Sequence, residues 1–251
     1  MNAMLRAMNA ERLKLRGTLA VWLCVLAPLT IILLGTMMAW SMPLSLANDA
    51  HEAPWRVFIN NLLAIWAGIM LPLLITLETA LLAGLEHNNH QWKHLLALPL
   101  PRSAHYAAKL AAMLGLTSLA TLVLCLLIPL GGLLIMLTAN SPLTGPPEWE
   151  YFCGRALATI VAALPMIAVQ MFIAIRWRSS SLAMISGITG TLVAMLTPKG
   201  GSFGELFPWG LPATAVMGDP AQRGFVVIAG FTAFLVVAML GAWDFSRREY
   251  A

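Results

Sequence analysis

Charged side chains are scarce in this chain. Asp, Glu, Lys and Arg make up 10% of the 251 residues, whereas hydrophobic residues make up 59%. Ordinary soluble domains carry roughly 25% charged residues. The scarcity excludes a solvated globular domain as the bulk of the protein. No segment outside the apolar runs is long enough to form a soluble domain of its own.

The usual signatures of nucleotide and metal chemistry are also missing. No Gly-x-x-x-x-Gly-Lys-Ser/Thr loop occurs, and the glycine cluster at 200–204 lacks the Lys-Ser/Thr ending. No His-Glu-x-x-His occurs, because Glu86 precedes both His87 and His90. We therefore expect no catalytic residue, no metal and no cofactor in this chain.

Cysteine and histidine give little support for a structural or metal site. The three cysteines predict no disulfide framework. His87, His90 and His94 would share one face of a helix, but the outer two would lie about 10 Å apart along its axis. One ion with bonds of about 2 Å cannot reach all three. A solvated or partner-facing histidine face is the alternative, and the function of these residues stays open.

Long uncharged runs are what the chain does have. Roughly 18 or more apolar residues are needed to cross a bilayer as a helix, and six runs approach or exceed that length. We therefore predict an all-α polytopic membrane protein with a single permease domain over 1–251. The second run is long enough to require tilting or a kink, for which Pro72 is a candidate. The predicted spans cover residues 18–42, 57–85, 110–139, 156–175, 179–197 and 224–243.

The basic residues predict the orientation, because Lys and Arg accumulate on the cytoplasmic side of short loops. With the N-terminus inside, eleven of the fifteen basic residues fall in inner segments and four in outer ones. Both termini are then cytoplasmic. The sequence pI of about 9.3 reflects this orientation and gives no reason to expect nucleic acid. The four outer basic residues are Arg56, Arg155, Lys199 and Arg223.

Residues 1–16 do not resemble a signal peptide, because Glu11 lies among the basic residues and the apolar run that follows is too long. Apolar side chains at positions 4, 5, 8 and 15 would share one side of a helix, with Arg12 and Arg16 on another. We predict a helix along the inner membrane surface. An ordinary basic flank that anchors the first span is the alternative.

Polar residues in the second span are candidates for a cavity or gate. Glu78 is the one ionisable residue well inside an apolar run, and such residues are costly in a membrane. It either reaches the headgroups or pairs with a basic residue of a neighbouring helix, or it lines a cavity or gate. Asn60 and Asn61 open the same span and can bond to other helices or face an outer vestibule.

The outer segment 198–222 interleaves aromatic rings with glycine and proline. Phe207 and Trp209 suit broken helical turns at the outer headgroup level. They form either an aromatic belt or an external gate. Glycines at 131–132, 187 and 190 allow close approach of neighbouring helices.

The largest polar segment between two apolar runs covers residues 86–109. It predicts a short amphipathic helix, then a Pro-x-Pro-Arg break, then the start of the next span. A compact cytoplasmic helix of this kind is typical of a surface presented to another protein. Since the chain holds no nucleotide motif, we expect that partner to supply the energy.

With these residues the chain resembles the permease subunit of type-2 ABC exporters, and in particular the lantibiotic-immunity permeases of bacteria. The resemblance covers the whole chain. It rests on the basic start at 11–16 and on the second span followed by Trp92-Lys93, Leu98-Pro99-x-Pro-Arg102, Tyr106 and Lys109, with Phe207-Pro-Trp-Gly-Leu-Pro212 and Arg247-Arg248-Glu249 later in the chain.

The resemblance implies a subunit in the bacterial plasma (inner) membrane that pairs with a second copy or a paralogue. Two cytosolic ATPase subunits would bind ATP and Mg²⁺, and the second and fifth spans would line a lateral cavity. Residues 86–98 would form the coupling helix, while the N-terminal helix would carry motion to the first span. The coupling residues implied are Glu86, Trp92, Lys93, Leu95, Leu96 and Arg102.

The predicted function is therefore a non-catalytic permease that expels an amphipathic peptide or lipid from the membrane, with protection against a lantibiotic as the leading hypothesis. A stand-alone secondary transporter or channel is the rival, but such proteins usually place several ionisable groups at mid-membrane. An ABC-type permease for lipid or haem-related maturation is a third possibility. The substrate, the dimer composition and the direction of transport stay open.

Overall fold

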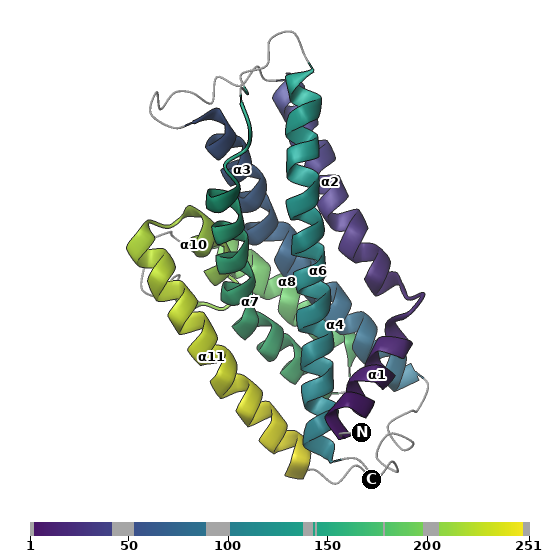
Figure 1. The fold of residues 1–251 in the computed structure, drawn as a ribbon. Helices are drawn as coiled ribbons and strands as arrows, with labels where there is room; N and C mark the ends of the chain where they lie inside the picture. The colour runs from purple at the N-terminus through teal and green to yellow at the C-terminus, as the bar shows by residue number, and fades with distance from the viewer. Residues whose placement is uncertain are drawn as a thin grey trace.

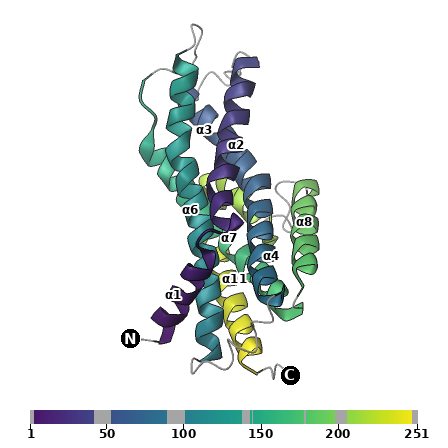
Figure 2. The same cartoon turned by 90° about the vertical axis from the view of Figure 1, so that its right-hand side faces the viewer.

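The computed structural model describes residues 3–41, 53–88, 101–137, 143, 145–177, 179–197 and 206–247, and within them all regular secondary structure is helical. The chain forms a bundle of long helices with two short ones, α1 and α10, at its edges (Figures 1 and 2). The elements are α1 (Ala3–Leu15), α2 (Leu19–Ser41), α3 (Pro54–Ile65), η1 (Trp66–Met70), α4 (Leu71–Asn88), α6 (Arg102–Met136), α7 (Trp149–Trp177), α8 (Ser180–Leu196), α10 (Leu211–Met217) and α11 (Pro220–Arg247).

Five helical stretches in the described part of the chain are long and apolar enough to cross a membrane, and α8 is a shorter apolar helix. The helices extend beyond several of the predicted runs. α6 begins at Arg102 rather than at 110, and α7 begins at Trp149 rather than at 156. Hydropathy places a span's end where polar residues begin, whereas the helix continues because residues such as His105 and Lys109 are buried in the bundle.

The second span contains an irregular turn close to the expected position. Its helix runs through α3, one π-helical turn at η1, and α4. Pro72 is the second residue after that turn. Proline has no N–H, and its ring crowds the carbonyl four residues earlier. A wider turn at this point accommodates both effects, since π-turns are single-turn insertions within α-helices.

The helices differ greatly in how far they are enclosed. α7 occupies the centre, with 72% of its most apolar window buried, whereas the corresponding share in α11 is 17%. α11 packs on α7, α2 packs on α6, and α8 packs on α4. α1 and the C-terminal end of α11 lie at one end of the bundle, and the start of α3 lies at the other (Figure 1). We call these the α1 end and the α3 end.

Two glycines bring α8 close to its neighbours, as the sequence predicted. A Cβ at Gly190 would lie 2.5 Å from the indole of Trp209. A Cβ at Gly187 would collide with the side chains of Thr76 and Gln170. Both positions therefore require the absence of a side chain, which is how small residues let membrane helices approach.

Candidate functional site

A buried ion pair joins α1 to α6 at the α1 end of the bundle. The Nζ of Lys109 lies 3.2 Å from Glu11 Oε1, and the Nζ of Lys14 lies 3.0 Å from the same oxygen. Glu11 is 3% exposed and Lys109 is 6% exposed. Ala7, one helical turn before Glu11, is also buried. The small Ala7 lets α1 approach its neighbours closely, and Glu11 then faces Lys109.

The surroundings of Glu11 keep its carboxylate charged. Burial raises the pKa of the Glu11 carboxyl. The charges and hydrogen bonds of Lys109 and Lys14 lower this pKa by more than burial raises it, so that it lies below its ordinary value of 4.5. Oε2 of Glu11 has no hydrogen-bond partner among the described atoms. The carboxylate therefore depends on the two lysines for its compensation.

A sharp turn carries α1 into the first span. Gly17 has φ of 74°, a left-handed conformation that glycine adopts without a steric penalty. Beside it, Thr18 Oγ1 donates a hydrogen bond of 2.8 Å to the carbonyl of Leu15. We call residues 15–19 the elbow. Its turn and hydrogen bond fix the orientation of the start of α2 relative to the end of α1.

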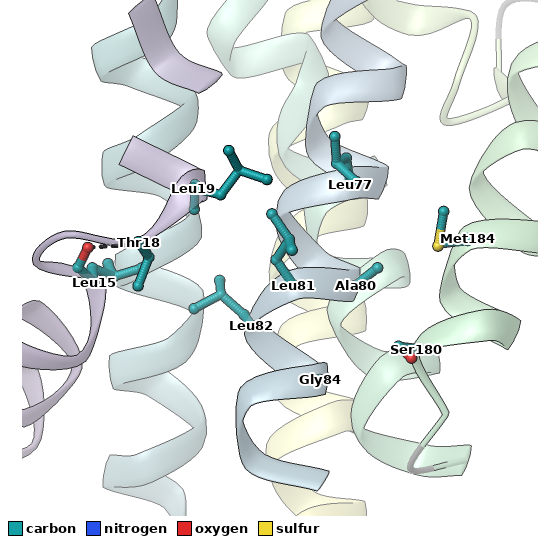
Figure 3. A pocket seen from close by; sticks show the side chains of 11 residues that line it. Leu15, Thr18, Leu19, Leu77, Ala80, Leu81, Leu82, Gly84, Ser180 and Met184 are labelled. Atoms are coloured by element: carbon teal, nitrogen blue, oxygen red, sulfur yellow. Dashed lines mark hydrogen bonds between the residues drawn. The ribbon is translucent and has the colours of Figure 1, made fainter. Parts of the chain in front are cut away.

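An apolar cavity of about 560 Å³ lies between this elbow, α4 and α8 (Figure 3). Its volume is within the range of small-molecule sites, roughly 300–1,000 Å³. Leu15, Thr18 and Leu19 form one wall, α4 forms the middle, and Ser180 and Met184 come from α8 (Figure 3). The lining contributed by α4 and by the start of α2 is completed by Ala20, Leu77, Ala80, Leu81, Leu82 and Gly84.

Glu78 is fully buried among α2, α4 and α6. The thiol of Cys24 on α2 lies 3.3 Å from Glu78 Oε1 and 3.5 Å from the carbonyl of Leu116 on α6. Glu78 Oε2 has no hydrogen-bond partner, and no basic side chain of the described part of the chain pairs with this carboxyl. Of the three predicted arrangements, pairing with a neighbouring Arg or Lys is therefore not the one that the described residues show.

A second buried polar contact joins α4, α7 and α8. The side-chain amide of Gln170 lies 3.2 Å from Thr76 Oγ1 and 3.2 Å from Ser186 Oγ. With the amide nitrogen toward Ser186, its oxygen accepts from Gly187 N and Thr76, so that both the oxygen and the nitrogen of the Gln170 amide have partners. This contact connects three helices through one amide.

At the α3 end, polar side chains join α3, α7 and α10. Arg56 and Glu148 form an ion pair of 2.5 Å, and Asn60 donates to the hydroxyl of Tyr151 at 2.8 Å. Arg155 lies 4.6 Å above the Tyr151 ring and donates to the carbonyl of Val216. Arg223 donates to the carbonyl of Ala215 at 3.0 Å. Two guanidinium groups thus satisfy carbonyls at the C-terminal end of α10, where helices leave such groups without intrahelical partners.

Of the other predicted site residues, some lie in the described part of the chain and some lie outside it. Asn61 is exposed, whereas Trp209 is buried against α8 and stacks on Phe207 with ring centroids 5.4 Å apart. Glu86 lies in the last turns of α4 and Arg102 begins α6, but their side chains lie outside the described residues. No group of metal-binding side chains occurs in the described part. Also outside it are Trp92, Lys93, Leu95, Leu96, His90 and His94, together with the side chain of His87.

Sequence reasoning did not identify Glu11 and Lys109 as a pair. One signal was present, because Glu11 is the first acidic residue of the chain and none follows until Asp49. An acidic residue alone among basic ones at a membrane surface indicates a specific partner. Nothing in the sequence identifies that partner as a lysine 98 residues later.

A helical chain with five stretches able to cross a membrane is a multi-pass membrane protein. A family model described as ABC-2 family transporter protein matches residues 7–193. The chain therefore belongs to the ABC-2 family, whose members are the membrane components of ABC transporters, generally without catalysis of their own, and work with ABC ATPase subunits. A comparison with curated protein sequences gave no match.

Proposed function

We propose that this chain is the permease subunit of an ATP-driven exporter in a bacterial plasma membrane. It would form one transmembrane domain of six spans, with α8 as the fifth span in chain order and both termini cytoplasmic. The family match supports the export machinery. The distribution of basic residues supports the orientation. The position of α1 and the end of α11 at the same end of the bundle agrees with an even number of spans (Figure 2).

In this proposal residues 86–98 dock on a cytosolic ATPase, with Trp92, Leu95 and Leu96 as buried anchors and Lys93 at the rim. Buried aromatic anchors usually dominate the affinity of such interfaces. The C-terminal end of α4 lies at the α1 end of the bundle, so the segment that follows begins on the proposed cytoplasmic side (Figure 1). Two ATPase subunits bind ATP and Mg²⁺, and a second permease copy or a paralogue completes the transporter.

The proposed substrate is an amphipathic molecule taken from the membrane, with a lantibiotic-type peptide as the first candidate and a lipid as the second. The observation that carries this proposal is the apolar cavity between the elbow, α4 and α8, because it lies on spanning helices near the proposed cytoplasmic end. An apolar lining favours hydrocarbon or apolar side chains over a soluble polar solute.

Purification of the tagged chain in a mild detergent, with mass spectrometry of the proteins that co-elute, tests the assembly. We expect an ATPase with a phosphate-binding loop, with or without a second permease. Trp92→Ala should abolish its co-elution while membrane insertion is retained. Trp177→Ala is the matched control, since Trp177 is an exposed tryptophan at a helix end. Elution of the wild-type chain alone would favour the secondary-transporter hypothesis.

Growth inhibition of a sensitive bacterium by a lantibiotic tests the substrate. Cells that produce the permease with its ATPase should tolerate a higher concentration than cells whose ATPase has lost its phosphate-loop lysine. Met184→Trp should remove the protection because it fills the cavity, whereas Met195→Trp on the same helix should not. Equal sensitivity of all strains would leave a lipid as the better candidate.

A further inference from the structure

We propose that the ion pair between Glu11 and Lys109 is the mechanical link through which movement at the ATPase-docking segment reaches the first span and the cavity. The inference rests on the proposed function, because it presumes that residues 86–98 move with an ATPase. It assigns Glu11 as a positioning residue that acts through α1.

The link begins at the first residue of α6. Arg102 follows the proposed docking segment closely, and α6 is continuous from that residue. Lys109 lies about two helical turns further along the same helix. Three residues, 99–101, separate the proposed docking segment from Arg102 in the sequence. A displacement passed on to Arg102 therefore reaches Lys109 along a continuous helix.

The link crosses to α1 through charge. α1 packs on α6 along its buried face, and the side chains that this face buries are Ala7 and Glu11. Its larger apolar residues Leu5, Met8 and Leu13 are exposed and so face away from the bundle. On this face the carboxylate of Glu11 accepts a hydrogen bond from Lys109 of α6, which is a strong directional contact between the two helices. A buried ion pair resists separation, because pulling it apart leaves an uncompensated charge.

The link ends at the cavity wall. α1 passes into α2 through the elbow at 15–19, and Leu15, Thr18 and Leu19 of this elbow line the cavity opposite α4 and α8 (Figure 3). A shift of α1 with α6 therefore moves one wall of the cavity relative to the other two. Arg12 and Arg16 are exposed and do not belong to this path.

Charge exchange tests the link. The variants are Glu11→Gln, Lys109→Gln and the exchange Glu11→Lys with Lys109→Glu, which keeps one carboxylate and two ammonium groups at the same place. Lys14→Gln is the matched control, because Lys14 binds the same oxygen from within α1 and makes no bridge to α6 through it. Each variant is studied in complex with the co-eluting ATPase, so that the ATP hydrolysis rate is recorded on the same sample.

Movement of the first span is measured with spin labels at Leu26→Cys on α2 and Ile228→Cys on α11, both at exposed side chains. Cys125 and Cys153 are replaced by serine, whereas Cys24 is buried and stays. The distance between the two labels is compared in the nucleotide-free state and after trapping with ATP and vanadate.

We expect trapping to change the label distance in the wild-type complex and in Lys14→Gln. Glu11→Gln and Lys109→Gln should still bind the ATPase and hydrolyse ATP but lose the change, and the exchange variant should regain it. If the ion pair only stabilised the fold, its loss would not remove the change in label distance while leaving ATP hydrolysis intact. A change of wild-type size in both single variants would overturn the link, as would a wild-type complex whose label distance trapping leaves unaltered.

Failure of the proposed function gives a different result, since the wild-type chain would then elute without an ATPase. Where a single variant does not fold, the exchange variant decides. Recovery of the label change supports the pair as the link, and its loss in a folded, ATP-hydrolysing complex overturns it.

Discussion

The two ends of the bundle each carry an ion pair between helices, and the pairs differ in their surroundings. Glu11 and Lys109 join α1 to α6, with side chains 4% and 7% exposed. Arg56 and Glu148 join the start of α3 to the chain just before α7, with side chains 45% and 37% exposed. The exposed pair is the shorter of the two, at 2.5 Å against 3.2 Å.

The shorter distance does not make the stronger contact. An exposed pair is screened by water and salt, and its net contribution is about 0–1 kcal/mol. Removing one partner of a buried pair costs about 3–5 kcal/mol, because the remaining charge has no water to compensate it. The contact between α1 and α6 thus contains a buried charge pair, whereas the contacts at the α3 end are distributed over an exposed charge pair, aromatic rings and carbonyls.

The largest effect is expected from breaking the buried pair. Glu11→Ala leaves Lys109 buried without its carboxylate and should lower the free energy of unfolding by about 3–5 kcal/mol. Titration from mild detergent into sodium dodecyl sulfate, followed by circular dichroism, measures this change. Lys14→Ala is the control with a small expected effect, since Lys14 is partly exposed. Equal effects of the two substitutions would contradict a special role for the interhelical pair.

The second largest effect is expected from a change in packing at Trp209. It tests whether apolar packing, rather than charge, keeps α8 against its neighbours. Gly190→Ala places a methyl group 2.5 Å from the Trp209 indole, so ring and helix must separate. Overpacking of this kind costs about 1–3 kcal/mol, measured by the same titration. Gly115→Ala is the matched control, because a Cβ there meets no atom within 4 Å. Stabilisation by both substitutions would show that Trp209 moves aside freely.

The sequence predicted the helical class and the approximate bounds of the five stretches that are long enough to cross a membrane, because a bilayer requires apolar residues along the whole of such a stretch. It also predicted irregularity near Pro72 and close approach at Gly187 and Gly190, since proline and glycine have the same backbone consequences wherever they occur.

The contacts between distant residues were not predictable in this way. Glu78 was expected either at the headgroups, beside a basic residue, or in a cavity, but the structure gives it the thiol of Cys24 as its partner. Glu11 and Lys109 meet because two helices pack face to face, and one sequence does not record which faces meet. Local sequence patterns thus predicted the helices, whereas the contacts between residues far apart in the sequence depend on how the helices pack.

The smallest effect is expected at the exposed pair, and it completes the comparison. Arg56→Ala removes the ion pair with Glu148 and the contact with the Tyr151 ring, 5.0 Å from the guanidinium. We expect a loss of about 0–1 kcal/mol, because water replaces most of the interaction with Glu148. The loss should shrink further at high salt, which screens exposed charges, while the loss for Glu11→Ala should stay nearly constant. Unfolding of both variants at low and high salt checks this, with Glu148→Ala as the control that removes the pair but leaves Arg56 over Tyr151. A salt-independent loss of several kcal/mol at Arg56 would mean that the exposed pair contributes as much as the buried one.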